Sequence, residues 1–153
     1  MEKNNARHGH APQPVQTVKP RAHGLYVSGV TDVRPLERPV VDAHCHMDVS
    51  FDDTHDVTSV DSALAAAAAV GVTHVIQVGC DVESSRWAAA AATTHDNVWA
   101  TVAIHPNDAA RDPDLMSSLA VIRELAALPV VRGIGETGLD YFRTKKEQAA
   151  AQH

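Results

Sequence analysis

Two histidines separated by one residue, His44 and His46, have the types and spacing that metal chemistry requires. They end the apolar run at residues 40–48, which reads Val-Val-Asp-Ala-His-Cys-His-Met-Asp. Successive side chains of a β-strand point to opposite faces, so the two imidazoles would share one face and Cys45 would take the other. Two imidazoles on one face can bind one transition-metal ion. The alternative is a pair of surface histidines at the end of a strand.

Acidic residues flank this histidine pair. Asp42 precedes it by two residues, and Asp48 follows it by two. A carboxylate that accepts a hydrogen bond from a metal-bound imidazole fixes the tautomer of that ring. We therefore expect Asp42 and Asp48 to be the partners that fix the tautomers of the two histidines.

A candidate carboxylate ligand, Glu136, lies in the glycine-rich segment 132–141, Arg-Gly-Ile-Gly-Glu-Thr-Gly-Leu-Asp-Tyr. Three glycines around one acid indicate a backbone bent for close approach to a ligand. A buried carboxylate is costly unless it is paired or bound to metal. The alternative is a surface glutamate in a turn. His105, before Pro106, is a metal ligand, a substrate contact or part of a loop turn.

Composition limits the classes of function. The 153-residue chain is long enough for one ordinary domain with a core. Residues 1–38 hold six basic and three acidic residues, a net charge of +3, whereas residues 39–153 hold seven and sixteen, a net of −9. An acidic body argues against non-specific coating of nucleic acid. It leaves a nucleic-acid enzyme possible, because bound divalent cations reverse the local field.

The cysteine content and the hydropathy bear on location. The two cysteines, Cys45 and Cys80, form no spaced cluster, which is typical of a reducing cytoplasm. No segment approaches the roughly 20 apolar residues of a membrane span, so we expect no membrane association. Residues 1–38 are polar and rich in proline and glycine, and we expect a disordered N-terminal extension before a domain at residues 39–153.

From Pro39 onward, short β-branched runs alternate with alanine-rich helical segments. Strands are predicted at residues 40–43, 73–78, 98–104 and 130–135. Helices are predicted at residues 60–69 with Thr58 or Ser59 as the cap, at 83–94 with Asp81 as the cap, from Asp112-Pro113 to about residue 128, and from a capping box of Thr144 and Glu147.

This alternation predicts a parallel α/β sheet, either a small doubly wound sheet or the first half of an eight-unit barrel. No Gly-x-Gly-x-x-Gly follows the first strand, so a dinucleotide-binding fold has no support. The carboxyl ends of parallel strands share one rim, where active sites form. The four candidates, His44, His46, His105 and Glu136, all follow predicted strands. We therefore expect them to share one site.

Three motifs, in order, carry a family resemblance. They are Val-Asp-Ala-His-Cys-His-Met-Asp, Ala-Ile-His-Pro and Gly-Ile-Gly-Glu-Thr-Gly-Leu-Asp-Tyr. Together they strongly resemble the TatD family of metal-dependent hydrolases, deoxyribonucleases of the amidohydrolase-like superfamily. The match runs from about residue 39 to the end and covers the first half of the family's pattern. The resemblance implies that about four βα units here form the first half of a TIM (β/α)₈ barrel.

The resemblance also implies a mechanism and roles for the candidate residues. The family hydrolyses phosphodiester bonds of DNA with two divalent ions, which would be Mg, Mn or Zn. By this resemblance His44 and His46 bind one ion, Glu136 bridges both as the catalytic carboxylate, and His105 lies near the substrate phosphate. Thr137 departs from the aliphatic residue that family members often have after the glutamate.

The family's pattern includes two more histidines and an aspartate from later strands, which this sequence does not contain. We therefore expect an incomplete fragment that carries three of six metal ligands. Three functions remain open: a DNA phosphodiesterase, a metal-dependent esterase, amidase or lactonase of the same superfamily, and a non-catalytic fragment. DNA or another phosphodiester is the expected partner, and no obligate protein partner is inferred.

Overall fold

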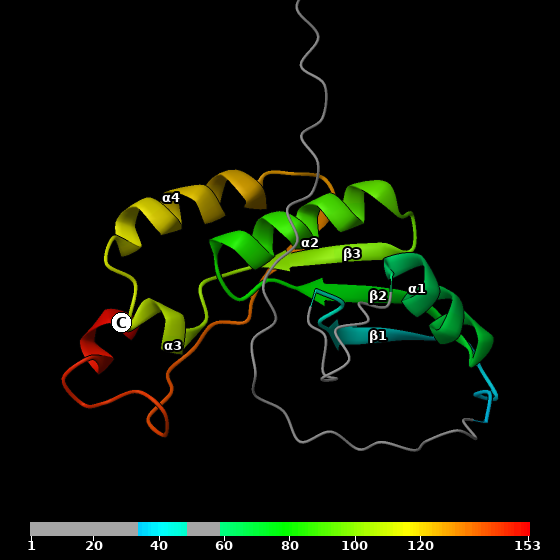
Figure 1. The fold of residues 1–153 in the computed structure, drawn as a ribbon, viewed down its shortest axis with the longest axis horizontal. Coiled ribbons are helices and arrows are strands. Elements are labelled where there is room, and N and C mark those ends of the chain that lie inside the picture. Colours follow the sequence, from blue (N-terminus) through cyan, green and yellow to red (C-terminus); the bar gives the residue numbers. More distant parts are fainter. Residues whose placement is uncertain (1–33, 49–58) are drawn as a thin grey trace, which may run out of the picture.

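The computed structural model describes residues 34–48 and 59–153, which form a parallel sheet with helices packed on it (Figure 1). The strands are β1 (Val40–Cys45), β2 (Val72–Val78), β3 (Val98–Val102) and β4 (Val131–Ile134), hydrogen-bonded in the order β1-β2-β3-β4. Every neighbouring pair is parallel. This confirms the predicted α/β class and fits the first half of a TIM barrel. Most of the predicted N-terminal extension, residues 1–33, lies outside the described residues.

Three helices connect the strands and cover one face of the sheet, as Figure 1 shows. They are α1 (Val60–Ala69), α2 (Val82–Thr94) and α4 (Leu115–Ala126). A short helix α3 (Pro106–Ala109) follows β3, and a 3₁₀ helix η1 (Ala149–Gln152) comes near the end of the chain. Within the described parts of the chain, no helix is long and apolar enough to cross a membrane.

The first two helices have the caps that the sequence predicts, although α2 begins at Val82, one residue before the predicted start. The Ser59 hydroxyl accepts the backbone N–H of Ser62 at 3.2 Å, which caps α1. At α2, Asp81 accepts the N–H of Ser84 at 2.8 Å, and the Ser84 hydroxyl accepts the N–H of Asp81 at 3.0 Å. This reciprocal capping box satisfies two amide donors that the helix itself leaves without partners.

The core lies between the sheet and the helices in two clusters. The first consists of Leu64, Val75, Ala88, Ala92, Val98 and Ala100, with Cys45 and Met47 packed against it. The second consists of Ala89, Val102, Ile104, Ala109, Ile122 and Leu125. The alanines of α2 let the helix approach the strands closely. At Gly79, just after β2, an added Cβ would lie 2.5 Å from the Cα of Ser85, so the position has room only for glycine.

The two later helices differ from the prediction. Helix α4 begins at Leu115, after its cap Asp114, because the Asp112 side chain instead accepts the N–H of Asp114 at 2.8 Å. The predicted helix at Thr144 and Glu147 is wrong, since residues 141–148 form turns and irregular backbone before η1. The Thr144 hydroxyl bonds to side chains outside this segment and does not cap a helix.

Candidate metal centre

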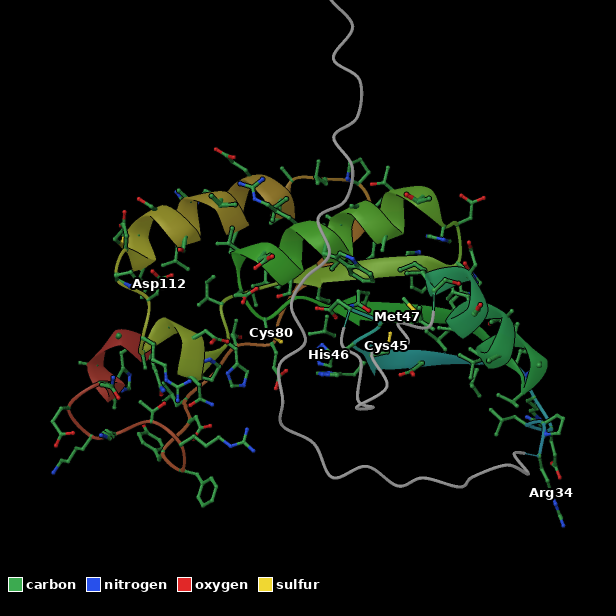
Figure 2. All side chains as sticks on the ribbon, viewed as in Figure 1. Arg34, Cys45, His46, Met47, Cys80 and Asp112 are labelled. Atoms are coloured by element: carbon green, nitrogen blue, oxygen red, sulfur yellow. The ribbon has the colours of Figure 1, made fainter. Side chains whose placement is uncertain are left out.

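The two imidazoles lie side by side at the carboxyl end of β1, where Figure 2 labels His46. Their Nε2 atoms are 3.2 Å apart, and the ring centroids are 5.1 Å apart. Cys45, the residue between them in the sequence, points the other way. Its thiol donates to the Ile76 carbonyl at 3.4 Å, and the side chain packs against the core. The prediction that His44 and His46 share one face, opposite Cys45, is confirmed.

The carboxylate of Glu136 joins the two imidazoles. Glu136 lies just beyond β4, with its Oε2 atom 3.6 Å from Nε2 of His44. One ligand atom from each of His44, His46 and Glu136 can be chosen so that all three lie within 4.8 Å of one another. The structure thus brings together the three residues that the sequence proposed as metal ligands.

The strands that carry these ligands are not neighbours, since β1 and β4 are the outer strands of the described sheet. Adjacent strands lie about 4.8 Å apart, so three steps across a flat sheet would separate β1 and β4 by about 14 Å. Side chains stand roughly perpendicular to a sheet and would not meet across that span. The contact between His44 and Glu136 therefore requires a curved sheet with these side chains on its concave face.

The donor geometry fits a metal ion. Zinc–nitrogen bonds are about 2.0–2.1 Å long, so two nitrogens 3.2 Å apart subtend an angle of about 100° at a shared ion. That angle lies between the tetrahedral and octahedral values. Two imidazoles and one carboxylate suit Zn or Mn, and the carboxylate also suits Mg. The two imidazole nitrogens are therefore spaced as two ligands of one ion.

His105 lies on the other side of the Glu136 carboxylate, with its Nε2 atom 3.6 Å from Oε1. Its Nδ1 atom accepts the backbone N–H of Asn107 at 3.1 Å, which caps α3. A neutral imidazole whose Nδ1 is an acceptor carries its proton on Nε2. His105 is therefore arranged to donate a hydrogen bond into the site.

Asp42 and Asp48 have different partners from those predicted. Asp42 accepts the backbone N–H of His44 at 3.0 Å, and Asp48 accepts the side-chain amide of Gln77 at 2.8 Å. Asp42 therefore holds the backbone at His44, and Asp48 contacts the Gln77 side chain, in place of the predicted contacts with the imidazole rings. The sequence analysis did not predict a role for Gln77. The one sequence feature that points to it is that an amide side chain interrupts an otherwise apolar part of a strand.

Two thiols lie near the site, labelled in Figure 2. Cys80 lies 3.8 Å from Oε2 of Glu136, and burial together with that carboxylate raises its pKa to about 12. Burial, with smaller effects of Asp42 and Asp48, raises the pKa of Cys45 to about 11. Both cysteines are free of disulfides. Each thiol is therefore protonated at neutral pH and is not a ready nucleophile.

An open cleft of about 560 Å³ lies beside the carboxylate, lined by His105, Pro106, Glu136 and residues 137–142. Asp140 organises its wall by accepting the N–H groups of Phe142 and Arg143, both at 2.7 Å, and the Asn107 side-chain amide at 2.9 Å. These hydrogen bonds, the one from Arg143 foremost, lower the pKa of Asp140. Asp140 therefore shapes the cleft through the loop backbone.

Comparisons with known proteins agree with this geometry. The family described as "TatD related DNase" matches residues 41–153. A Mycobacterium tuberculosis protein named "Uncharacterized metal-dependent hydrolase TatD" is 41% identical over 103 residues, covering 67% of this chain and 38% of that protein. The "3'-5' ssDNA/RNA exonuclease TatD" of Cronobacter sakazakii is 37% identical over 93 residues, covering 61% and 35%.

The Escherichia coli protein of the same name is 34% identical over 94 residues, which cover 60% of this chain and 35% of that protein. The chain thus spans little more than a third of the length of these curated relatives. The family match includes β1 from Val41 onward, β2 to β4, both histidines of the pair, His105 and Glu136. From the curved parallel sheet, the clustered donors and this match, we conclude that the chain belongs to the TatD family of metal-dependent hydrolases.

Proposed function

We propose that this chain forms part of a metal-dependent phosphodiesterase site that acts on single-stranded nucleic acid. The observation that carries the proposal is the convergence of His44, His46 and Glu136 within 4.8 Å, beside an open cleft. Two of the relatives are named 3'-5' ssDNA/RNA exonucleases, which supports this substrate class.

The proposed roles follow from the positions of the donor atoms. His44 and His46 would hold one divalent ion, Mg, Mn or Zn, and Glu136 would supply carboxylate oxygens to that ion and to a second one. The two oxygens of Glu136 support a bridging role, because Oε2 faces His44 and Oε1 faces His105. Bound ions of this kind polarise a phosphate and lower the pKa of a water molecule. His105 donates its Nε2–H to a phosphate oxygen in the cleft.

Three protein donors leave most ligand positions of two ions unfilled by protein, since each ion takes at least four ligands. The relatives are much longer than the matched segment, which supports the proposal that the remaining donors come from further residues of a longer protein. We expect the 153-residue chain alone to have nuclease activity near background. Its two free thiols support action in a reducing cytoplasm.

A chimera tests the function with a complete set of ligands. The segment of the Cronobacter sakazakii exonuclease that matches this chain is replaced by this chain's residues. We expect the chimera to release nucleotides from single-stranded DNA in the presence of Mn²⁺. Glu136→Gln should lower the rate by at least about 100-fold, because loss of a ligand exceeds the 10–100-fold effect of outer contacts.

Glu124→Gln is the matched control, because it makes the same chemical change at an exposed position of α4. Equal activity of the two variants would refute the role of Glu136. A chimera that hydrolyses p-nitrophenyl acetate in a Glu136-dependent way, without acting on DNA, would instead indicate an esterase-type enzyme. The unmodified Cronobacter sakazakii protein is the positive control for the DNA assay.

A further inference from the structure

A glutamine side chain is completely buried behind the histidine pair. Gln77 of β2 has 0% of its surface exposed. Alternation along the strand places it on the same face as Val75, which belongs to the core under the helices. A buried amide is costly unless both its donor and its acceptor are satisfied. The partners of Gln77 therefore indicate why an amide occupies this position.

The oxygen and the nitrogen of the Gln77 side chain form hydrogen bonds with the two residues that follow His46. The Oε1 atom of Gln77 accepts the backbone N–H of Met47 at 2.8 Å, and Nε2 donates to Oδ1 of Asp48 at 2.8 Å. The Cys45 thiol lies 3.8 Å from the same Oε1 atom. Figure 2 shows Cys45, His46 and Met47 together at the end of β1. Gln77 thus holds the turn that begins where β1 ends.

This contact constrains His46 directly. The N–H of Met47 belongs to the peptide group that joins His46 to Met47, so the hydrogen bond fixes the plane on the carboxyl side of His46. On the other side, the backbone N–H of His44 bonds to Asp42 at 3.0 Å. The backbone of the His44–His46 segment is therefore held at both ends, which sets the direction of the two imidazoles.

We propose that Gln77 is a positioning residue for the metal centre and keeps the His46 imidazole beside that of His44. Packing alone does not require the amide, since methionine or leucine fills nearly the same volume without a polar group to satisfy. This inference rests on the metal-binding role proposed above for His44, His46 and Glu136.

Zinc affinity of the full chain tests the proposal, measured by titration calorimetry with ZnCl₂. Gln77→Met keeps the length of the side chain and removes both hydrogen bonds. We expect it to weaken zinc binding by about 10–100-fold, the range typical of residues that orient ligands. The matched control is Ile122→Ala, which destabilises the second core cluster without touching the β1–β2 end of the sheet. It should keep the affinity of the wild-type chain.

A double variant, His44→Ala with His46→Ala, gives the background from the other histidines of the chain. If Gln77→Met and Ile122→Ala bind zinc equally well at matched unfolding temperatures, the role of Gln77 is refuted. If the wild-type chain binds no more tightly than the double variant, the metal centre itself is refuted. Gln77→Leu is the second variant, and tight zinc binding by either folded Gln77 variant overturns the inference.

Discussion

At the residue scale, the Glu136 carboxylate lies between two imidazoles, those of His44 and His105. Its oxygens lie 3.6 Å from His44 and 3.6 Å from His105. Hydrogen bonds between such groups are about 2.7–3.2 Å long. At 3.6 Å the carboxylate is within reach of both rings without a short hydrogen bond to either.

His46, just after β1, and His74 of β2 provide a sharp test of the ligand assignment. We expect His46→Ala to weaken zinc binding by more than about 100-fold, because it removes one of three donors. His74→Ala should leave zinc affinity unchanged, since its ring stacks on Trp99 with centroids 5.0 Å apart. Titration calorimetry of both variants measures this difference. Equal affinities, at equal fold stability, would contradict the assignment.

The sequence predicts which candidate site residues come together better than it predicts what supports them. His44, His46, His105 and Glu136 follow strand ends, so the rule that parallel strands share a rim is enough to group them. The partners of Asp42 and Asp48 depend on how the turn after β1 folds, which no local pattern reports. The same holds for Gln77, because its burial depends on the packing of that turn over β2.

At the element scale, one polar network links the unpredicted helix α3 to the failed helix prediction at Thr144. The His105 side chain caps α3, and a histidine is not a usual cap, so the sequence gives no signal for that helix. Asn107 then accepts the Thr144 hydroxyl at 2.8 Å, and Gln152 donates to the same hydroxyl at 2.6 Å. These long-range bonds use the group that a local capping box would need.

The loop held by Asp140 should be sensitive to acid. Its pKa is lowered from the ordinary value of 3.8, so the ionised form stabilises the folded state above that pH. This contribution is lost as the pH falls through the lower folded pKa. The asparagine of Asp140→Asn does not ionise, so this variant lacks the contribution at every pH. We expect this variant to unfold at a lower temperature than wild type at pH 7, with the gap closing as the pH falls below 3.8.

Thermal unfolding followed by circular dichroism across this pH range measures the gap. Asp96→Asn, in the exposed turn between α2 and β3, is the matched control and should show no comparable gap at pH 7. A constant gap between wild type and Asp140→Asn from pH 7 to pH 2 would show that the loop does not depend on the ionised carboxylate.

At the scale of the whole molecule, the described sheet is open at both sides. Within residues 34–48 and 59–153, β1 pairs only with β2, and β4 pairs only with β3. Ile134 of β4 is 59% exposed, although it ends a strand that would be interior in a closed barrel. Strands with unpaired edges and exposed apolar side chains are templates for pairing with another chain.

We therefore expect the 153-residue chain to self-associate on purification. Ile134→Lys should shift it toward the monomer, because a charged edge opposes strand pairing. Met116→Lys is the matched control: Met116 is 76% exposed but lies on α4, away from the strand edges. Sedimentation velocity at several concentrations gives the distribution of species. A wild-type chain that stays monomeric throughout would contradict this prediction.

The curvature that brings β1 and β4 together has a consequence for folding. An ion bound by His44 and Glu136 would join two points of the chain about 90 residues apart, as a covalent crosslink does. Crosslinks of that span reduce the entropy of the unfolded chain by an amount equivalent to roughly 4–5 kcal/mol at 25 °C. Such an ion would also resist flattening of the sheet, so metal binding and closure of the barrel would favour each other.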